Sequence, residues 1–469
     1  MADRLNVLLV ETDEQTARTL EVYGHGQCRT PTLMRLAAEG TTFENAYTAS
    51  PVCVPSRVAM YSGCYPHTTG CTTNDHLFRP ELPNLLFPFR DAGYELALIG
   101  KNHCFPEKQL ALFDHVWACG HMGPRHPKRE CTKRAYEWLK ERQIWTQCWG
   151  HAAVPFPAEC SGTAETVGEA IRYLDERGSE APFFLWCSIA DPHTPIQAPE
   201  PYGALYDPET VELPPWREGE MEDKPVRQQI DWCAMCGDTV TEEVARQTLA
   251  VYLGMNTYVD HEVGSLLDAL DRLGLSENTL VVYTSDHGDY AAEHKMIRKS
   301  TAMYDCLWRV PLLMRLPGRI PAGVRQAGFV SLVDLMPTML DLCGLESRAL
   351  VDGRSFAAGV TGEPFDWQDR IFGEMGQPGP TAGRDDLEQV PEGPLTPDFR
   401  PKQKLGSNSG HVAAVRTAGW KCVLDQTGER ELYDLAADPW ELCNLAGDPG
   451  HADRVERLSR EIREWLTGT

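Results

Sequence analysis

Continuous apolar runs alternate with amphipathic stretches along the first two thirds of the chain. Residues 5–11 read LNVLLVE, an apolar run closed by an acid, which is typical of a strand buried on both faces of a parallel sheet. Helical periodicity is clearest at residues 163–177 and 242–273. Further runs of the buried-strand kind occupy residues 96–100, 182–190, 279–285 and 310–315. This alternation predicts an α/β domain with a mostly parallel sheet.

Charged side chains stand directly after four of the predicted strands. They are Asp13, Lys101, Asp191 and Asp286. In open α/β sheets, ligands gather at the carboxyl ends of the strands. One site could therefore collect these four residues.

The composition and the hydrophobic pattern of the chain change after residue 350. Residues 376–410 are rich in Pro, Gly and charge, which predicts a long surface loop. Short alternating strands and a terminal helix are predicted at residues 412–416, 421–425, 430–434 and 451–466. We therefore expect a large α/β domain over residues 1–350 and a smaller domain with an antiparallel sheet over residues 351–469.

The composition is that of an ordinary globular protein, with 42% hydrophobic and 24% charged residues. No apolar run is long enough to span a bilayer, and the N-terminal run is too short for a signal peptide. We therefore expect a cytoplasmic protein without a membrane partner, whose 16 cysteines are mostly reduced. The net charge of −24 disfavours nucleic acid as a partner, although a small anion could enter a local basic pocket. A homo-oligomer stays open.

The segment Cys-Val-Pro-Ser-Arg at residues 53–57 carries the most specific chemistry. Pro55 suits the first turn of a helix, so Cys53 would stand at the helix N-terminus, where free N–H groups and the dipole favour an anion. With Arg57 nearby, this is an electropositive place for a thiol. From these residues alone two interpretations stay open, a reactive cysteine and a buried structural cysteine ahead of a helix.

Two further groups are candidates for a site. Asp13-Glu14 and Asp286-His287 are pairs that together offer the oxygen ligands a hard divalent cation needs, whereas a single pair is better explained as a helix cap or a turn. The second group is cationic or titratable. Its members are Lys101, His103, His193 and Lys299. Taken one at a time, each would be explained as an ordinary surface lysine or loop histidine.

Taken together, these residues resemble the formylglycine-dependent (type I) sulfatases of the alkaline phosphatase superfamily. The Cys-x-Pro-Ser-Arg motif, the Gly-Lys-x-His and Pro-His-x-Pro segments, and the distance from Asp286 to Lys299 are all similar to that family. The similarity extends from Asn6 to Asn444, with a departure at Cys64, where the family usually has Arg. The resemblance implies a large mixed, mostly parallel sheet sandwiched by helices, and a smaller C-terminal α+β domain with a four-stranded antiparallel sheet.

The resemblance also implies a nucleophile. A formylglycine-generating maturation enzyme would oxidise Cys53 to formylglycine (3-oxoalanine). The hydrate of that aldehyde supplies the nucleophile, and Arg57 would hold it. His103 would be the base that removes the remaining hydroxyl proton, so that sulfate is expelled and the aldehyde restored.

Sulfuryl transfer develops charge on the equatorial and leaving oxygens, which calls for cations and a proton donor around the group. Lys101, Lys299 and the metal ion fit the first role, and His193 or Lys299 fits the second. Asn74 is either a further contact to the sulfate or a turn residue.

The metal ligands of the family correspond to Asp13, Glu14, Asp286 and His287. Calcium is the usual ion, and Mg²⁺, Mn²⁺ or Zn²⁺ stays open, in part because His287 adds a nitrogen ligand. Glu14 departs from the Asp or Gln that the family usually places there.

No motif encodes the alcohol part of the substrate. Residues 104–160 either line a substrate pocket or form an ordinary cap over the site, and they include Trp117, His126, Trp145, Trp149 and His151. We expect a small sulfated carbohydrate. Two alternatives stay open: a phosphonate monoester or phosphodiester hydrolase of the same superfamily, and a catalytically silent metal-binding protein with the same fold. Ser56 and the Lys101/His103 pair argue against the first, and the completeness of the site argues against the second.

Overall fold

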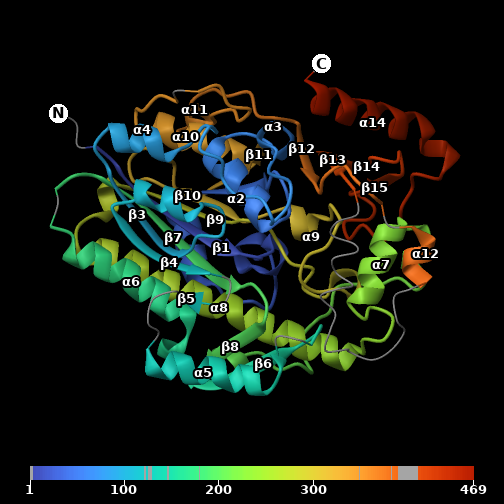
Figure 1. Ribbon diagram of the computed structural model, residues 1–469, viewed down its shortest axis with the longest axis horizontal. Helices are drawn as coiled ribbons and strands as arrows, with labels where there is room; N and C mark the ends of the chain where they lie inside the picture. The colour runs from blue at the N-terminus through green and yellow to red at the C-terminus, as the bar shows by residue number, and fades with distance from the viewer. Residues whose placement is uncertain are drawn as a thin grey trace.

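The computed structural model describes residues 4–120, 123–124, 129–144, 147–178, 180–347, 349–381, 383–388 and 410–468. Within these ranges no helix is both long and apolar enough to cross a membrane. Figure 1 shows a large sheet between two layers of helices, with a smaller sheet and the C-terminal helix beside it.

The large sheet has nine strands in the order β11-β2-β10-β9-β1-β7-β3-β4-β5. Their bounds are β1 Asn6–Asp13, β2 Thr41–Tyr47, β3 Glu95–Lys101, β4 His115–Gly120, β5 Gly123–Pro124, β7 Phe183–Pro192, β9 Thr279–Ser285, β10 Leu312–Arg315 and β11 Val324–Ser331. The central strands β9, β1, β7 and β3 pair in parallel, which confirms the predicted sheet. The run predicted at residues 310–315 forms β10, and this strand is antiparallel to both of its neighbours.

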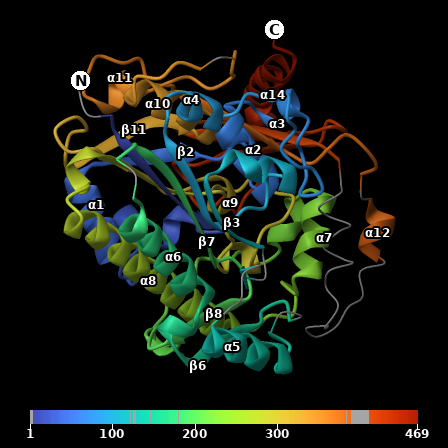
Figure 2. The ribbon, with the colours of Figure 1, turned by 60° about the vertical axis from the view of Figure 1, so that its left-hand side comes forward.

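Helices cover both faces of this sheet, as Figures 1 and 2 show. Leu8 and Val10 of β1 pack in one core cluster with α1 Pro31–Glu39, α6 Gly162–Glu176 and α8 Glu242–Arg272. Val7 and Leu9 point to the opposite face, because side chains alternate along a strand. There they pack with α2 Cys53–Ser62, α4 Leu86–Asp91, α10 Leu335–Leu342 and α11 Ala357–Val360.

The second sheet is antiparallel, in the order β12-β13-β14-β15. Its strands are β12 Arg370–Met375, β13 Val412–Thr417, β14 Trp420–Asp425 and β15 Arg430–Asp434, and α14 Ala452–Thr467 packs on it. Tyr47 and Trp308 share a core cluster with Val423 of β14, so the two sheets are joined by packing. Within the predicted loop 376–410 the structure has α12 Arg384–Glu388, and residues 389–409 lie outside the described residues. The domain boundary at residue 350 stays a prediction.

The remaining α-helices and strands of the described residues lie between these elements. They are α3 Pro66–Thr69, α5 Glu130–Glu141, β6 His151–Pro157, β8 Ile196–Glu200, α7 Val226–Ala234 and α9 Asp305–Trp308. β6 and β8 pair in parallel and α5 packs on β6, below the large sheet in Figure 1. This layer contains much of the Trp- and His-rich stretch, of which His126 and Trp145 lie outside the described residues.

Candidate functional site

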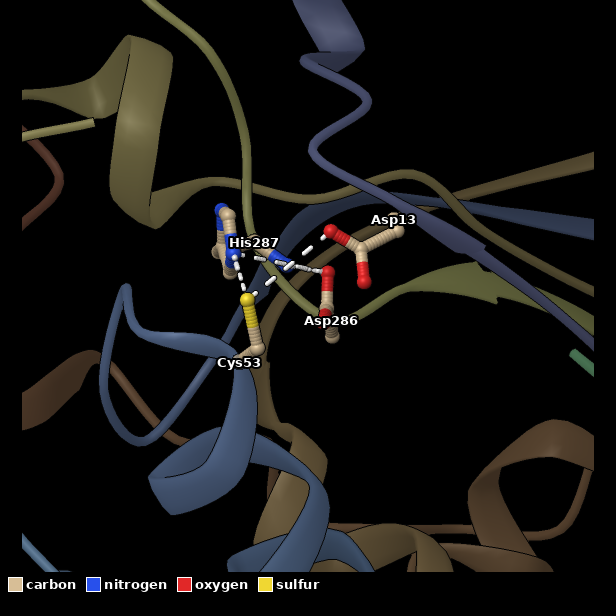
Figure 3. Close-up of side chains that lie close together, drawn as sticks. All are labelled: Asp13, Cys53, Asp286 and His287. Carbon is tan, nitrogen blue, oxygen red and sulfur yellow. Dashed lines mark hydrogen bonds and ion pairs between the residues drawn. The ribbon is translucent and has the colours of Figure 1, made fainter. Parts of the chain in front are cut away.

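Three separate stretches of the chain meet at the carboxyl ends of the central strands. Asp13 ends β1, Cys53 begins α2, and Asp286 and His287 follow β9. Each offers one ligand atom, and these atoms lie within 4.8 Å of one another (Figure 3). All four side chains are fully buried. The structure therefore brings together residues that the sequence suggested from separate motifs.

Local contacts fix the start of α2 against this cluster. Pro55 lies in the first turn, as predicted, and the side chain of Asn74 accepts a hydrogen bond from Val54 N at 3.0 Å. The Ser56 hydroxyl donates to the main-chain oxygen of Asp286 at 2.6 Å. Cys53 is thus held at a helix N-terminus beside the carboxylates, and Asn74 helps to position it.

The thiol of Cys53 lies among polar groups. Its sulfur is 3.2 Å from Nε2 of His287, 3.8 Å from Oδ1 of Asp13 and 3.9 Å from Nζ of Lys101. Burial and Asp13 raise the pKa of this thiol, but Lys101, Lys299 and His287 outweigh them and lower it to about 5. The site therefore favours an anion at the end of the Cys53 side chain.

Arg57 connects the acids of the site, and within the described residues its recorded interaction with Cys53 is electrostatic. Its Nε and Nη2 donate to Asp286 Oδ2 and Asp13 Oδ2, both at 2.9 Å, and Nη1 donates to Ser188 at 2.9 Å. The same nitrogen lies 3.2 Å from Glu11 Oε1. A planar guanidinium can satisfy several carboxylates at once, which a lysine could not.

Glu11 was not identified from the sequence. It is fully buried in β1, and its Oε2 accepts a hydrogen bond from Trp186 Nε1 at 2.7 Å. Burial raises the pKa of Glu11 to about 8 against the opposing effect of Arg57. The available signal was an acid inside an apolar strand, since a buried acid requires a partner.

The donor set fits a divalent cation. Nδ1 of His287 lies 2.8 Å from the carbonyl oxygen of Gly288, so Nδ1–H donates there and Nε2 faces the cluster. Metal-binding histidines are commonly oriented in this way. Asp286 raises the pKa of this imidazole to about 9 against the effect of burial, and an ion at Nε2 would replace the proton. Burial and Asp13 together raise the pKa of Asp286, which shows two carboxylates crowded at one place. Asp13, Asp286 and His287 are therefore the residues that would hold the ion.

Glu14 stands at the edge of that set. It belongs to a second potential ligand group with Asp13 and His193. Its Oε1 accepts from Lys299 Nζ at 2.8 Å, and its Oε2 is 3.5 Å from His193 Nε2. Burial opposes ionisation, but His193 and Lys299 lower the pKa of Glu14 to about 2. The carboxylate links the candidate metal ligands to the cations of the pocket.

A cavity of about 320 Å³ opens next to these residues, and Glu14, Asn74, His193, Arg298 and Lys299 help to line it. Nδ1 of His193 lies 2.7 Å from the carbonyl oxygen of Thr194, which assigns the proton to Nδ1 and leaves Nε2 as an acceptor. Nζ of Lys299 is 3.4 Å from this Nε2.

The remaining residues suggested by the sequence differ in how they relate to the cluster. Lys101 lies beside Asp13 and Cys53, as predicted. Burial lowers the pKa of His103 to about 3, and the positive charges of Lys101 and Arg57 act in the same direction. Asp191 does not join the cluster. Its carboxylate accepts a hydrogen bond from the Thr163 hydroxyl of α6 at 2.6 Å, and its charge interacts with that of Asp13, so Asp191 lies beside the site without belonging to the potential ligand groups.

The mixed sheet, the flanking helices and the buried cluster at the strand ends define a hydrolase of the alkaline phosphatase superfamily. A family model described as Sulfatase matches residues 5–345. The chain belongs to the Sulfatase family.

Relatives agree with this assignment. The chain is 28% identical to an arylsulfatase of Clostridium perfringens, over 99% of this chain and 94% of that protein. It is also 28% identical to the multifunctional alkaline phosphatase superfamily protein PehA of Trinickia caryophylli, over 98% and 95% of the two chains. A solved phosphonate monoester hydrolase of Agrobacterium radiobacter superposes with a TM-score of 0.83 at 26% identity, covering 99% of this chain and 96% of that one.

Proposed function

We propose that this enzyme hydrolyses sulfate esters and releases inorganic sulfate, with a nucleophile made from Cys53. The observation that carries the proposal is the place of Cys53, at the N-terminus of α2 and within 4.8 Å of two carboxylates and an imidazole. Formylglycine at this position would supply a hydrated aldehyde, whose hydroxyl attacks sulfur. In the unmodified chain, the Cys53 sulfur marks where those oxygens would lie.

The basic residues of the site then have separate roles. Lys101 contacts Asp13 and faces the end of Cys53, where it would neutralise the attacking oxygen. Lys299 lies on the pocket side, where it would hold the sulfate oxygens and donate a proton toward the leaving alcohol. His193 accepts from Lys299 and would keep its ammonium group aimed into the pocket. His103 stays our choice for the base, since its low pKa keeps it unprotonated.

A divalent cation completes the proposed site. Asp13, Asp286 and His287 would hold it, and Glu14 would be a fourth ligand or would instead retain its contact with Lys299. When bound, the ion would add positive charge next to the attacking and equatorial oxygens. Calcium is proposed from the family resemblance, and Mn²⁺ or Zn²⁺ from the imidazole ligand.

A phosphonate monoester hydrolase is the second candidate, because the solved enzyme of that activity superposes with a TM-score of 0.83. Sulfate and phosphonate monoesters both carry one negative charge, so net charge does not separate them. The deciding experiment compares kcat/KM for matched aryl sulfate and aryl phosphonate monoesters on one metal-loaded preparation. We expect the sulfate ester to be turned over faster, and a faster phosphonate ester would overturn the sulfatase proposal.

For the natural substrate we propose a small sulfated carbohydrate. The cavity of about 320 Å³ suits a small ligand, and Asn74, Asp75 and Arg298 offer polar groups at its wall. A panel of sulfated monosaccharides and disaccharides, aryl sulfates and choline sulfate would test this. Carbohydrate esters that are poorer substrates than simple aryl sulfates would contradict it.

A further inference from the structure

A third group of potential metal-ligand side chains, separate from the first two, lies between the segment that follows β9 and the start of α9. Glu293, His294 and Cys306 each offer one ligand atom, and these atoms lie within 4.8 Å of one another. Their exposures are 5%, 1% and 0%. A thiol, an imidazole and a carboxylate form a donor set that zinc accepts. None of these three residues belongs to the Cys53 site.

Two buried atoms of this group have no hydrogen-bond partner among the described residues, Nε2 of His294 and Oε2 of Glu293. Unsatisfied buried polar atoms are costly, and they commonly mark the place of a water or an ion. Nη1 of Arg18 lies 3.6 Å from Oε2 of Glu293. At that distance the guanidinium compensates part of the negative charge without making the hydrogen bond.

The His294 ring is oriented as metal-binding histidines are. Its Nδ1 contacts Oε1 of Glu220, a buried carboxylate, so Nδ1–H donates there and Nε2 keeps its lone pair. His287 shows the same arrangement at the first site, with Gly288 O in place of Glu220. The His294 ring is also stacked on Tyr304 at a centroid distance of 3.9 Å, which holds its direction.

The backbone around this group is strained. Ala291, Ala292, His294 and Lys295 all have positive φ, at 45°, 73°, 57° and 55°. Non-glycine residues in this region of φ are strained, and such strain clusters at ligand clamps. Glu293 also lines a cavity of about 390 Å³ with Arg18, from which an ion or a water molecule could reach the group.

We propose that Glu293, His294 and Cys306 bind one Zn²⁺ ion. Glu220 orients His294, and a water molecule from the adjacent cavity takes the fourth position of a tetrahedral site. The Cys306 thiol loses its proton to solvent when the ion binds, because the thiolate is the ligand. The ion ties the strained loop, which leads directly to Lys299, to α9.

Cobalt provides the test, because Co²⁺ bound to a thiolate gives a sulfur-to-metal absorption band in the near ultraviolet. The reference is full-length Cys53→Ser protein, stripped with a chelator, since the Cys53 thiol lies in the first site. We expect a band that saturates at one equivalent of Co²⁺ and is displaced by Zn²⁺. If circular dichroism shows that this protein is folded and it still gives no thiolate band, the proposal is wrong, regardless of the results for the further variants.

Two variants in the same background assign the ligand. Adding Cys306→Ser should abolish the band, and a band that survives would overturn the assignment. Adding Cys422→Ser, which removes a buried thiol of the second sheet, should leave the band intact, and its loss would equally contradict the assignment. Glu220→Gln should weaken Zn²⁺ binding by about 10–100-fold, as loss of an orienting carboxylate does elsewhere. Unchanged affinity would refute the role of Glu220.

Discussion

Glu14→Gln tests whether charge at the pocket edge selects the substrate. Glu14 is the acid at which the chain departs from the Asp or Gln usual in the family it resembles. Its Oε1 accepts from Lys299 Nζ at 2.8 Å, and its pKa of about 2 keeps it ionised at neutral pH. Removing this charge should favour dianions more than monoanions, because repulsion scales with ligand charge.

The size of the effect follows from this geometry. An anion held on the far side of Lys299 would lie roughly 5.6 Å from Glu14, which is twice the length of the Lys299–Glu14 ion pair. At an effective dielectric constant of about 20, the repulsion between Glu14 and that anion is roughly 3 kcal/mol per unit of charge on the anion. An aryl phosphate monoester carries up to one more negative charge than an aryl sulfate. Allowing for screening by solvent, the preference for sulfate over phosphate should narrow by about 10–100-fold.

The assay measures kcat/KM for a matched aryl sulfate and aryl phosphate monoester on metal-loaded wild type and Glu14→Gln. Glu14→Asp keeps the charge, and Asp75→Asn removes an exposed carboxylate from the wall of the same cavity. Both controls should retain most of the wild-type ratio. A sulfate-to-phosphate ratio that stays constant or widens in Glu14→Gln would refute the charge argument, provided that bound metal is unchanged.

Three other perturbations have definite expected results. Enzyme made with a maturation enzyme should give a Cys53 peptide with the mass of the aldehyde, and an ordinary thiol mass in active enzyme would exclude this nucleophile. Asp286→Asn should reduce both the bound divalent metal and kcat, and by more than the about 10–100-fold that is typical when a hydrogen-bond partner of a ligand is lost. Metal analysis and an aryl sulfate assay measure these losses, and full metal content would show that Asp286 is not a ligand. Lys421→Met should lower the free energy of unfolding by about 3–5 kcal/mol, because Asp305 and Glu441 lose a buried cation. Urea unfolding measures this loss, and a change under about 1 kcal/mol would contradict it.

The parts of the fold that were predictable are those whose burial leaves a mark in the sequence. The strands β1, β3, β7 and β9 are buried on both faces, so each is a continuous apolar run. The direction of β10 was not predictable, because a continuous apolar run is compatible with either a parallel or an antiparallel strand. β11 was missed because its first residues are exposed and its sequence mixes polar and apolar residues without a clear period. Residence in the cytoplasm stays a prediction.

At the site, the sequence indicated side chains that carry a motif, and it missed those that only support one. Asp13, Cys53 and Lys101 belong to recognisable segments, and they meet as expected. Glu11 and Ser188 belong to no motif, and their pairing with Arg57 depends on the register between β1 and β7, where Glu11 lies opposite Ser188. Side chains that meet only through strand register leave no local signal.

The charges of the finished site make a bound cation more than an accessory. Glu11, with a pKa of about 8, is mostly protonated at neutral pH, whereas neighbouring cations lower the pKa of Asp13 and Glu14, and Asp286 is paired with Arg57. Three basic side chains face them one for one, namely Arg57, Lys101 and Lys299. An anionic ester therefore meets a site whose lysines and arginine are already balanced by carboxylates. Asp286 raises the pKa of His287 to about 9 against the effect of burial, so this imidazole carries a positive charge that it would give up on becoming a metal ligand. We therefore propose that a divalent ion supplies the surplus positive charge that binds and activates the ester, beyond what Lys101 and Lys299 provide.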